Sequence, residues 1–342
     1  FFDLRDKVAV YRLNINGNTE GDQALRLHLV SDSAIAILKD SRVAFKSIDA
    51  QAQVANDTIL YNLNWLNDFN GSEANSSTFS GYADVTNHKD IVLGLRNSGI
   101  YLNNNKWEFN NENNIHIQKG AIAVNNLRIS DSSSTIQVDG TYNKTHPELM
   151  TVKINDVDLS VLNPLTAKID FGGELSANVN TSSRNGKMFL FGKALANRFV
   201  CNEERLGNVF LFAVLDTTNK VSFNGGVFES KEKFNSNILN NYNIRDFQKE
   251  DNIVAKVNGN YDQKKFTVHT TFDDLNAGFL EPFLSGFSDH FDGKASGKLN
   301  FYATPDSSYF DGTVHADDIN IGIAPLGMSY IVQNQDIRFN SQ

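Results

Sequence analysis

The chain has 342 residues, of which 40% are hydrophobic and 21% charged, and its formal net charge is −9. This balance is typical of a folded protein with a large core, and no window approaches the roughly 18 consecutive apolar residues of a membrane-spanning helix. The negative charge excludes nucleic acid as an expected partner, because nucleic-acid-binding proteins neutralise phosphates with clustered Lys and Arg. The single cysteine, Cys201, excludes a small disulfide-stapled module and is compatible with the bacterial periplasm.

No secretory signal begins at Phe1, so we expect a chain that is either cytoplasmic or starts downstream of its targeting segment. Asn accounts for 44 residues and Gly for 23, against only 5 Pro. Both abundant residues tolerate left-handed backbone, and Asn also forms Asx turns. The composition therefore predicts many tight chain reversals.

Alternation of apolar and polar residues recurs almost throughout the chain. It predicts strands, because successive side chains of a strand point to opposite faces of a sheet. Helical periodicity is confined to 32–40, 159–165 and 275–287. The sequence therefore predicts an all-β fold with a few short helices. The expected strands are 7–15, 25–30, 58–65, 91–95, 115–124, 127–129, 135–142, 151–159, 173–180, 187–191, 209–214, 220–228, 253–261, 265–272, 295–303, 310–323 and 328–339.

A longer repeat lies over the strand pattern. The stretch that begins at Gly140 aligns with the stretch that begins at Gly259. In each, a Gly-x-Tyr strand end leads to an alternating strand, a short apolar segment with one proline, and a Gly that opens the next strand. Repetition at a fixed period is typical of elongated repeat architectures. We therefore expect one continuous repetitive β region over 1–342, with weak repeat units at 140–258 and 259–342, and 1–55 as the least certain part.

Motifs for catalysis or metal binding are weak. The stretch GKASGKL at 293–299 is similar to a phosphate-binding loop, but it lacks one spacer and has Leu299 in place of the metal-binding Ser or Thr. We interpret it instead as the start of a strand that contains glycines. Two histidines lie near aspartates and could suggest a metal or acid/base site: His290 has an Asp on each side, and His269 precedes Asp273 and Asp274. We interpret both groups as solvated turn residues. We expect no enzyme activity, no metal and no cofactor.

One-sided hydrophobicity is the main feature left to explain. An ordinary sandwich, or a closed solenoid, would bury an apolar sheet face against a second layer. A long sheet curled into a trough would instead leave its apolar face partly open, as a binding surface for acyl chains. Both interpretations stay open on the pattern alone. The candidates for an apolar groove are Ile115, Ile117, Ile122, Val124, Leu127, Ile129, Ile136, Val138, Tyr142, Val152, Ile154, Leu175, Ala177, Val179, Val209, Leu211, Val221, Phe223, Leu299, Phe301, Phe310, Val314, Ile319 and Ile321.

The stretch 106–143 resembles a recurring unit of TamB proteins, the translocation and assembly module subunits related to AsmA. It has a Trp-x-Phe strand at Trp107 and Phe109, a strand that ends near Gly120, an Asn-Leu pair at Asn126, and a strand that closes with Asp-Gly at Asp139. Three further stretches are similar to the Bacteroidetes versions. They are 56–68, 206–226 and 310–340, the last of which resembles the entry into the family's C-terminal domain.

The resemblance implies a β-taco, an elongated U-shaped sheet with an apolar interior, in a periplasmic segment of an envelope-spanning protein. It implies an N-terminal inner-membrane anchor outside this chain, so that the chain is an internal to C-terminal fragment. It also implies phospholipid acyl chains as cargo, with roles in phospholipid transport and outer-membrane biogenesis. An outer-membrane Omp85-type barrel, TamA or BamA-like, would be a partner through the C-terminal part that is absent here.

Three other functions remain open from the sequence. A chaperone-like platform would offer open strand edges to outer-membrane β-barrel proteins during their assembly. A structural or adhesive β-solenoid would have no continuous apolar lane. A β-helix enzyme acting on polysaccharide would need clustered carboxylates and exposed aromatic residues on one outer face, and no such cluster is evident.

Overall fold

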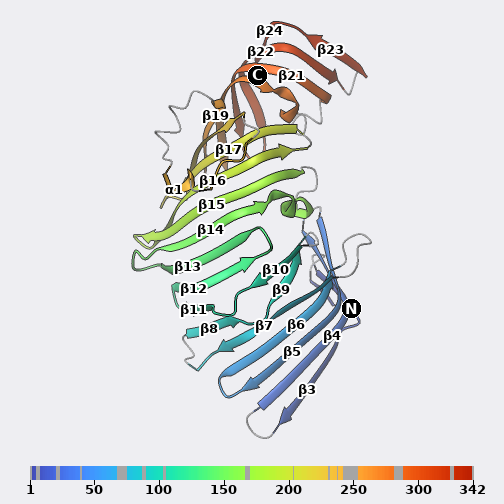
Figure 1. Ribbon diagram of the computed structural model, residues 1–342, viewed down its shortest axis with the longest axis vertical. Coiled ribbons are helices and arrows are strands. Elements are labelled where there is room, and N and C mark those ends of the chain that lie inside the picture. Colours follow the sequence, from blue (N-terminus) through green and yellow to red (C-terminus); the bar gives the residue numbers. More distant parts are fainter. Residues whose placement is uncertain are drawn as a thin grey trace. The chain divides into compact units, whose positions relative to one another are not determined.

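The computed structural model describes residues 2–4, 8–20, 24–38, 41–67, 75–86, 90–102, 105–165, 170–202, 204–229, 232–236, 238–241, 253–280, 288–323 and 327–340. These residues form two compact units (Figure 1). The first unit comprises residues 1–157 and 161–167, and the second comprises 158–160 and 168–342.

Both units are built from strands, which confirms the all-β prediction. The first unit contains β1 Phe2–Leu4, β2 Val8–Tyr11, β3 Asn14–Glu20, β4 Ala24–Leu38, β5 Ser41–Ala55, β6 Thr58–Asn67, β7 Asn75–Asp84, β8 Asp90–Leu95, β9 Gly99–Leu102, β10 Asn105–Phe109, β11 Asn114–Gln118, β12 Ala121–Ser130, β13 Thr135–Asn143 and β14 Met150–Asp158, followed by the 3₁₀ helix η1 Leu159–Leu165.

In its described residues, the second unit adds one short α-helix and one 3₁₀ turn to its strands. It contains β15 Phe171–Arg184, β16 Lys187–Cys201, β17 Glu204–Leu215, β18 Val221–Phe228, α1 Ile238–Asn241, β19 Ile253–Asp262, β20 Lys265–Asn276, η2 Ala277–Leu280, β21 Ser288–Ala303, β22 Ser308–Ile323, β23 Met328–Val332 and β24 Gln335–Phe339. No helix in the described part of the chain has the length and apolar character that a membrane crossing requires.

The described strands belong to one 24-stranded sheet, in which neighbouring strands are mostly consecutive in sequence and pair antiparallel. In the first unit β4 to β7 form successive hairpins, and so do β11 to β14. In three places of this unit, two strands pair with successive parts of the same longer strand. β2 and β3 both pair with β4, β8 and β9 both pair with β7, and β11 and β10 both pair with β12. In the second unit β15 to β22 pair in order, and β23 and β24 share the edge of β22.

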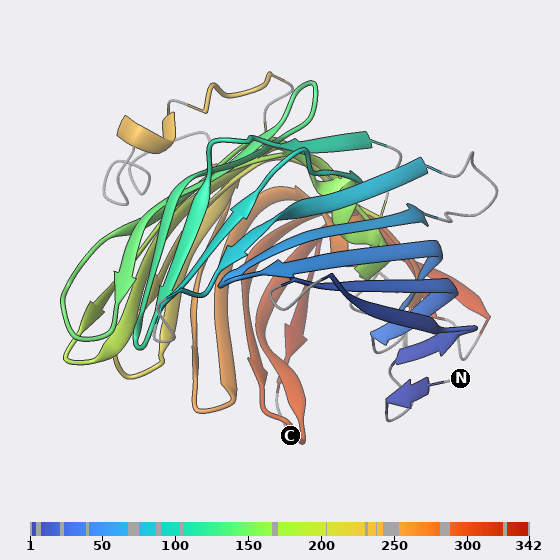
Figure 2. The same ribbon diagram turned by 90° about the horizontal axis from the view of Figure 1, so that it is seen from below.

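Long strands carry a bulge part-way along their length. One extra residue interrupts the register within β5, β12, β16, β20 and β22. Each bulge includes a residue with positive φ, and these are Ser47, Asn126, Arg198, Asp274 and Asp318. A bulge bends its strand and increases its twist. Figure 2 accordingly shows the strands of the second unit, drawn in yellow to red, bending part-way along their length.

A bulge also leaves a backbone N–H outside the ladder, and a polar side chain of the neighbouring strand accepts from it. The N–H of Asn126 donates to Asp139 Oδ1 at 2.9 Å, that of Arg198 donates to Asn208 Oδ1 at 2.9 Å, and that of Asp274 donates to the hydroxyl of Ser296 at 2.9 Å. These contacts give the many Asn, Asp and Ser residues a specific role. They occupy the interruptions of strands as well as the turns between them.

Buried polar side chains gather at the same interruptions. Asn113, 1% exposed, lies between β10 and β11 and accepts from the N–H of Leu95 at 2.9 Å. Ser98, in the break between β8 and β9, donates to the carbonyl of Ser80 at 2.8 Å. Ser77, which is fully buried, accepts from the N–H of Tyr101 at 3.0 Å. Side chains thus replace the ladder hydrogen bonds that the broken strands lack.

Three sequence predictions of local structure are wrong in detail. Residues 32–38 of the predicted helix lie in β4, where they pair with β2 and β5, and pairing on both sides overrides the helical periodicity. The predicted strand 115–124 is a hairpin, because Gly120 has a φ of 81° and reverses the chain between β11 and β12. The predicted strand 328–339 breaks at Asn334, which has a φ of 48°.

The other two predicted helices fare better. The segment 159–165 is the 3₁₀ helix η1, as expected. Of 275–287, the first residues end β20, Ala277–Leu280 form η2, and 281–287 lie outside the described residues. Both stretches of the proposed repeat therefore have the same order of elements. A hairpin (β13–β14 or β19–β20) is followed by a 3₁₀ helix (η1 or η2) and then by a further strand (β15 or β21).

Replacing Asn113 with Ala should destabilise the first unit. The substitution leaves the buried N–H of Leu95 without an acceptor, which typically costs about 1–3 kcal/mol. Trp65 and Trp107 both lie in this unit, so urea unfolding followed by tryptophan fluorescence reports on it. Asn125→Ala, at an exposed position on β12, is the matched control and should change the free energy of unfolding by less than about 0.5 kcal/mol. Equal stability of the two variants would contradict a structural role for Asn113.

Candidate functional site: the apolar faces of the two sheets

All groove candidates of the first unit lie on one face of its sheet. The register places Ile115 opposite Val124, and it places Ile129 opposite Ile136. A bulge between Val124 and Leu127 shifts the alternation by one residue, so that both of these side chains point to the same face despite their odd separation. The remaining rows of this face are Ile117–Ile122–Tyr142, Leu127–Val138–Val152 and Ile136–Ile154.

The candidates of the second unit also share one face. Val209 and Leu211 on β17 lie opposite Val227 and Gly225 of β18, and Phe223 continues that strand's row. The bulge at Asp318 keeps Ile319 on the face of Val314 and Ala316. The same face carries Leu175, Ala177 and Val179 of β15, Val221 of β18, Leu299 and Phe301 of β21, and Phe310 and Ile321 of β22. We call these two surfaces the apolar faces.

Most side chains of the apolar faces are only half-buried. Among the candidates, Val124, Ala177, Val314 and Ile319 are buried, and Ile122 is 41% exposed. The inner face of a closed sandwich would be buried throughout, because a second sheet packs against it. Among the described residues of each unit, no second sheet covers the apolar face.

The apolar faces carry no charged side chain along these register rows. The rows through β12 to β14 hold Ile, Val, Leu, Met, Tyr and Gly, and those through β17 to β20 hold Val, Leu, Ala, Phe, Gly, Tyr and Thr. In β12 to β14, polar residues occupy most of the alternate positions. Gln137, for example, lies between Ile136 and Val138, and it pairs with Arg128 and Lys153 on the opposite face.

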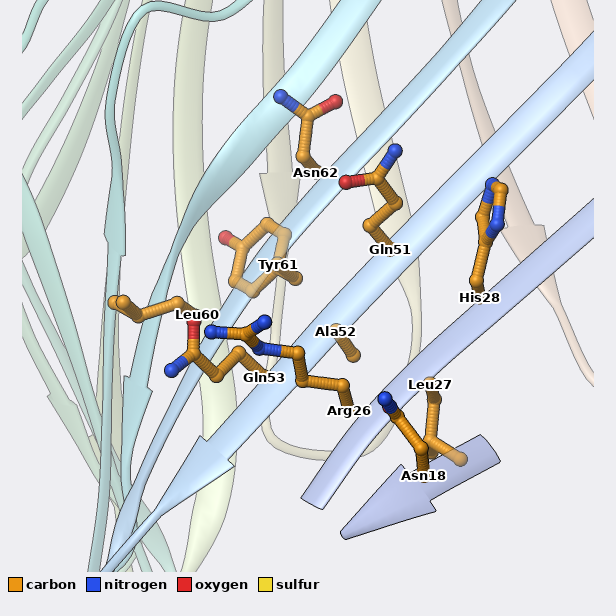
Figure 3. Close-up of a pocket in the computed structure, with 10 residues that line it drawn as sticks. All are labelled: Asn18, Arg26, Leu27, His28, Gln51, Ala52, Gln53, Leu60, Tyr61 and Asn62. Carbon is orange, nitrogen blue, oxygen red and sulfur yellow. The ribbon is translucent and has the colours of Figure 1, made fainter. Parts of the chain in front are cut away.

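The opposite face of the first unit forms a shallow polar groove of about 500 Å³ across β3 to β6 (Figure 3). Two cross-strand rows border it, Asn18–Arg26–Gln53–Leu60 and His28–Gln51–Asn62. His28 Nε2 lies 2.9 Å from Asp49 Oδ2, and this contact lowers the pKa of Asp49. Amide and charged side chains line the groove together with Leu27, Ala52, Leu60 and Tyr61, so it is more polar than the apolar face behind it but not free of apolar groups.

The second unit has a further apolar cluster on the side away from its apolar face. Leu195, Phe210 and Phe212, all nearly inaccessible, lie at the alternate positions of β16 and β17. Phe234 and Leu239 pack over them from a covering segment, residues 232–236 and 238–241. Figure 2 shows α1, which belongs to this segment, on the convex side of the bent strands.

Two buried amides hold the covering segment in place. Asn197 accepts from the N–H of Phe234 and donates to its carbonyl, both at 2.9 Å, as a neighbouring strand would. Asn208 donates to the carbonyl of Glu232 at 2.8 Å. The chain covers this cluster itself. On the apolar face a second buried cluster forms around Phe272, Val314 and Ile319, so only the half-buried part of that face remains accessible.

Pairing register reveals apolar-face residues that the sequence pattern missed. Phe266 pairs with Tyr261 and Ala303, and its ring stacks on that of Phe223 at 5.8 Å. Leu93 pairs with Ile115 in the first unit. The sequence predicts strands at both 265–272 and 91–95. Knowledge of which strands pair with them would have added Phe266 and Leu93 to the groove candidates.

Side chains singled out for chemistry do not converge. His269 Nδ1 lies 2.7 Å from Asn300 Oδ1 and is not bonded to Asp273 or Asp274. Asp274 pairs instead with Lys294. Within the described ranges, no group of three or more His, Cys, Asp and Glu side chains could hold a metal ion. The stretch 293–299 is part of β21, as the sequence indicated.

Cys201 should react slowly with a thiol reagent in the native protein. Its side chain is 5% exposed, and burial raises the pKa of its thiol, which lowers the fraction of reactive thiolate. We expect reaction with Ellman's reagent at pH ~8, near the ordinary thiol pKa, to be at least tenfold slower than in urea. A cysteine at exposed position 258 in a Cys201→Ser background should react rapidly. Equal native rates at the two positions would contradict the burial.

His315 should titrate above the usual range for histidine. Its Nδ1 lies 2.9 Å from Asp336 Oδ1 on β24 and its Nε2 lies 3.5 Å from Asp317 Oδ1, and the hydrogen bond to Asp336 raises the pKa of His315 most. Because the folded-state pKa is raised, the contact stabilises the pairing of β22 with β24 fully below the unfolded-state pKa. That contribution is lost as pH rises through the folded-state value.

An NMR titration of the imidazole checks this expectation. Asp336→Asn should lower the pKa of His315, whereas Asp311→Asn, elsewhere on β22, should leave it unchanged. An unshifted histidine in the unsubstituted protein would show that the contact does not form in solution.

Comparison with known proteins identifies no relative. No family model matches the chain, and neither a curated protein nor a solved structure is significantly similar to it.

Proposed function

We propose that the apolar faces bind acyl chains, and that the chain is a periplasmic segment of an envelope-spanning protein of the TamB type. In this proposal the sheets line a continuous U-shaped groove, a β-taco, along which phospholipid passes between the inner and outer membranes. The protein acts by binding and not by catalysis. Contact with an Omp85-type barrel would involve parts of the protein outside this chain.

One observation carries the proposal. The groove candidates of each unit share one face, and most of them are half-buried with no second sheet over them among the described residues, whereas the apolar cluster on the convex side of the second unit is covered by the chain itself. An uncovered apolar surface of this extent is typical of a binding surface. Its lack of charged groups suits a ligand that has no polar atoms to satisfy.

The mechanism is the removal of a solvation barrier. Exposing an acyl chain to water costs about 0.8 kcal/mol per methylene, so a two-chain lipid leaves a bilayer slowly. A surface of aliphatic and phenyl groups replaces most of the lost contacts during transfer. Because no polar pocket fixes a headgroup on these rows, a lipid would bind without being trapped.

The edge of the second unit favours a second candidate function. On β23, Met328 is 58%, Tyr330 45% and Ile331 69% exposed, and among the described residues only β22 pairs with this strand. An unpaired edge with apolar side chains can accept a further strand. A chaperone-like platform for β-barrel polypeptides would use this edge and not the apolar faces.

Site-specific photocrosslinking distinguishes the two functions. Benzoylphenylalanine at Val138 or Phe223 places the probe on an apolar face, and at Gln137 or Asn224 it places the probe on the opposite face of the same strands. After incubation with phospholipid vesicles, we expect lipid adducts at the first two positions to exceed those at the controls severalfold. The adducts are identified by mass spectrometry.

The same preparation is then offered an unfolded outer-membrane β-barrel protein. Polypeptide adducts at Ile331, without lipid adducts at Val138 or Phe223, would favour the chaperone-like platform. Equal lipid labelling on both faces, or none on either, would contradict an acyl-chain groove.

A further inference from the structure

A row of four phenyl rings crosses the apolar face of the second unit. Phe223 on β18 stacks on Phe266 of β20 at 5.8 Å, Phe266 meets Phe301 of β21 edge-on at 6.2 Å, and Phe301 contacts Phe310 of β22 at 4.9 Å. All four side chains are half-buried. We call them the phenyl row.

Gly259 makes the row continuous across β19, the strand between β18 and β20. Phe223 lies opposite this glycine, and a Cβ placed there would come within 2.6 Å of the phenyl ring. The ring of Phe223 therefore reaches across the intervening strand to Phe266. The four rings thus come from β18, β20, β21 and β22, and the ring of Phe223 bridges β19.

A second aromatic pair on the same strands provides a comparison. Tyr302 and Tyr309 follow Phe301 and precede Phe310, so they point to the opposite face, where their rings stack at 4.9 Å. Cross-strand aromatic pairs stabilise a sheet on either face. The phenyl row differs in having four members, no hydroxyl group and no charged neighbour along its register rows.

The length of the row fits a single acyl chain. Strands lie about 4.8 Å apart, so four intervals from β18 to β22 span roughly 19 Å. One leaflet's acyl chain extends about 15 Å, half of the ~30 Å hydrocarbon thickness of a bilayer. This is slightly less than the distance between the axes of β18 and β22, but the ring of Phe223 leans across β19 toward Phe266, so the rings span less than the strand axes do. An acyl chain lying across the strands would contact all four rings.

We propose that the phenyl row is the retention point of the second unit, where one acyl chain lies across β18 to β22 and contacts Phe223, Phe266, Phe301 and Phe310. The inference rests on the proposed function and adds the residues that hold the chain and its direction relative to the strands.

The chemistry of the row selects hydrocarbon over polypeptide or sugar. The backbone groups of β18 to β22 are engaged in ladders with their neighbours, and the four phenyl side chains offer no hydrogen-bonding groups, although Tyr261, the cross-strand partner of Phe266, carries a hydroxyl beside the row. A peptide or glycan laid on this surface would lose water from its polar groups without gaining partners, at about 1–3 kcal/mol per group. An alkyl chain has no such groups to desolvate.

The test compares adjacent residues of β21 and β22 in the full chain. The probe is phosphatidylcholine carrying one cis-parinaroyl chain, whose fluorescence rises in an apolar environment. We expect Phe301→Ala/Phe310→Ala to weaken binding at least tenfold, through lost apolar contact, and Tyr302→Ala/Tyr309→Ala to change it less than twofold. Phe301→Leu/Phe310→Leu keeps most of the apolar area and should bind within about threefold of the unsubstituted chain.

Thermal unfolding verifies that each variant is folded. If the double Ala variant does not fold, Phe310→Ala and Tyr309→Ala form the matched single pair, with a loss of threefold or more expected for Phe310→Ala alone. Equal binding by the Phe and Tyr variants, or an equal loss in both, would overturn the phenyl row. Lipid crosslinks at Val138 and Phe223 that accompany either result would leave the proposed function intact, whereas their absence would overturn both.

Discussion

Antiparallel backbone pairing is the interaction on which each unit depends. Side-chain burial is limited, and the larger of the two clusters of buried residues in the second unit gathers around Val314, Ala316 and Ile319. A sheet with only one packed layer derives much of its order from ladder hydrogen bonds, which fix the register. That register decides which side chains share a face. A slip of one residue would move a whole strand's apolar set to the other side.

Bulges reconcile this constraint with long strands. Each bulge shifts the sequence alternation by one residue and keeps the apolar residues on their face, as from Val124 to Leu127 and from Ala316 to Ile319. The cost is an unpaired backbone N–H, which a polar side chain of the next strand satisfies, as Asp139 does for Asn126. Where a strand breaks completely, buried residues such as Asn113 take the place of ladder partners. The high Asn content follows from this architecture, because Asn both adopts positive φ and replaces backbone hydrogen bonds.

The second unit has apolar side chains on both sides of its strands, and the two sides differ in whether the chain covers them. Its convex side carries Leu195 and Phe210, and the covering segment buries both side chains. Hydrogen bonds from the amides of Asn197 and Asn208 hold that segment in place. Its apolar face carries the phenyl row, which no element of the described unit covers. The covering segment closes the cluster on the convex side, whereas the apolar face is buried around Val314 and Ile319 and stays accessible at the phenyl row, and that asymmetry underlies the proposed acyl-chain groove.

The sequence by itself determined the fold class and most of the apolar face, because a period of two places side chains on alternate sides of a strand wherever the strand pairs. The common face of Ile136, Val138 and Tyr142 could be read directly from that period. Tertiary pairing alone decided the hairpin at Gly120, the strand at 32–38 and the place of Phe266 in the row, because local pattern does not reveal which strands become neighbours. It also decided which apolar surface stays open. Leu195 and Phe223 both belong to alternating strands, and only the fold brings residues 232–236 and 238–241 over the first and leaves the second half-buried.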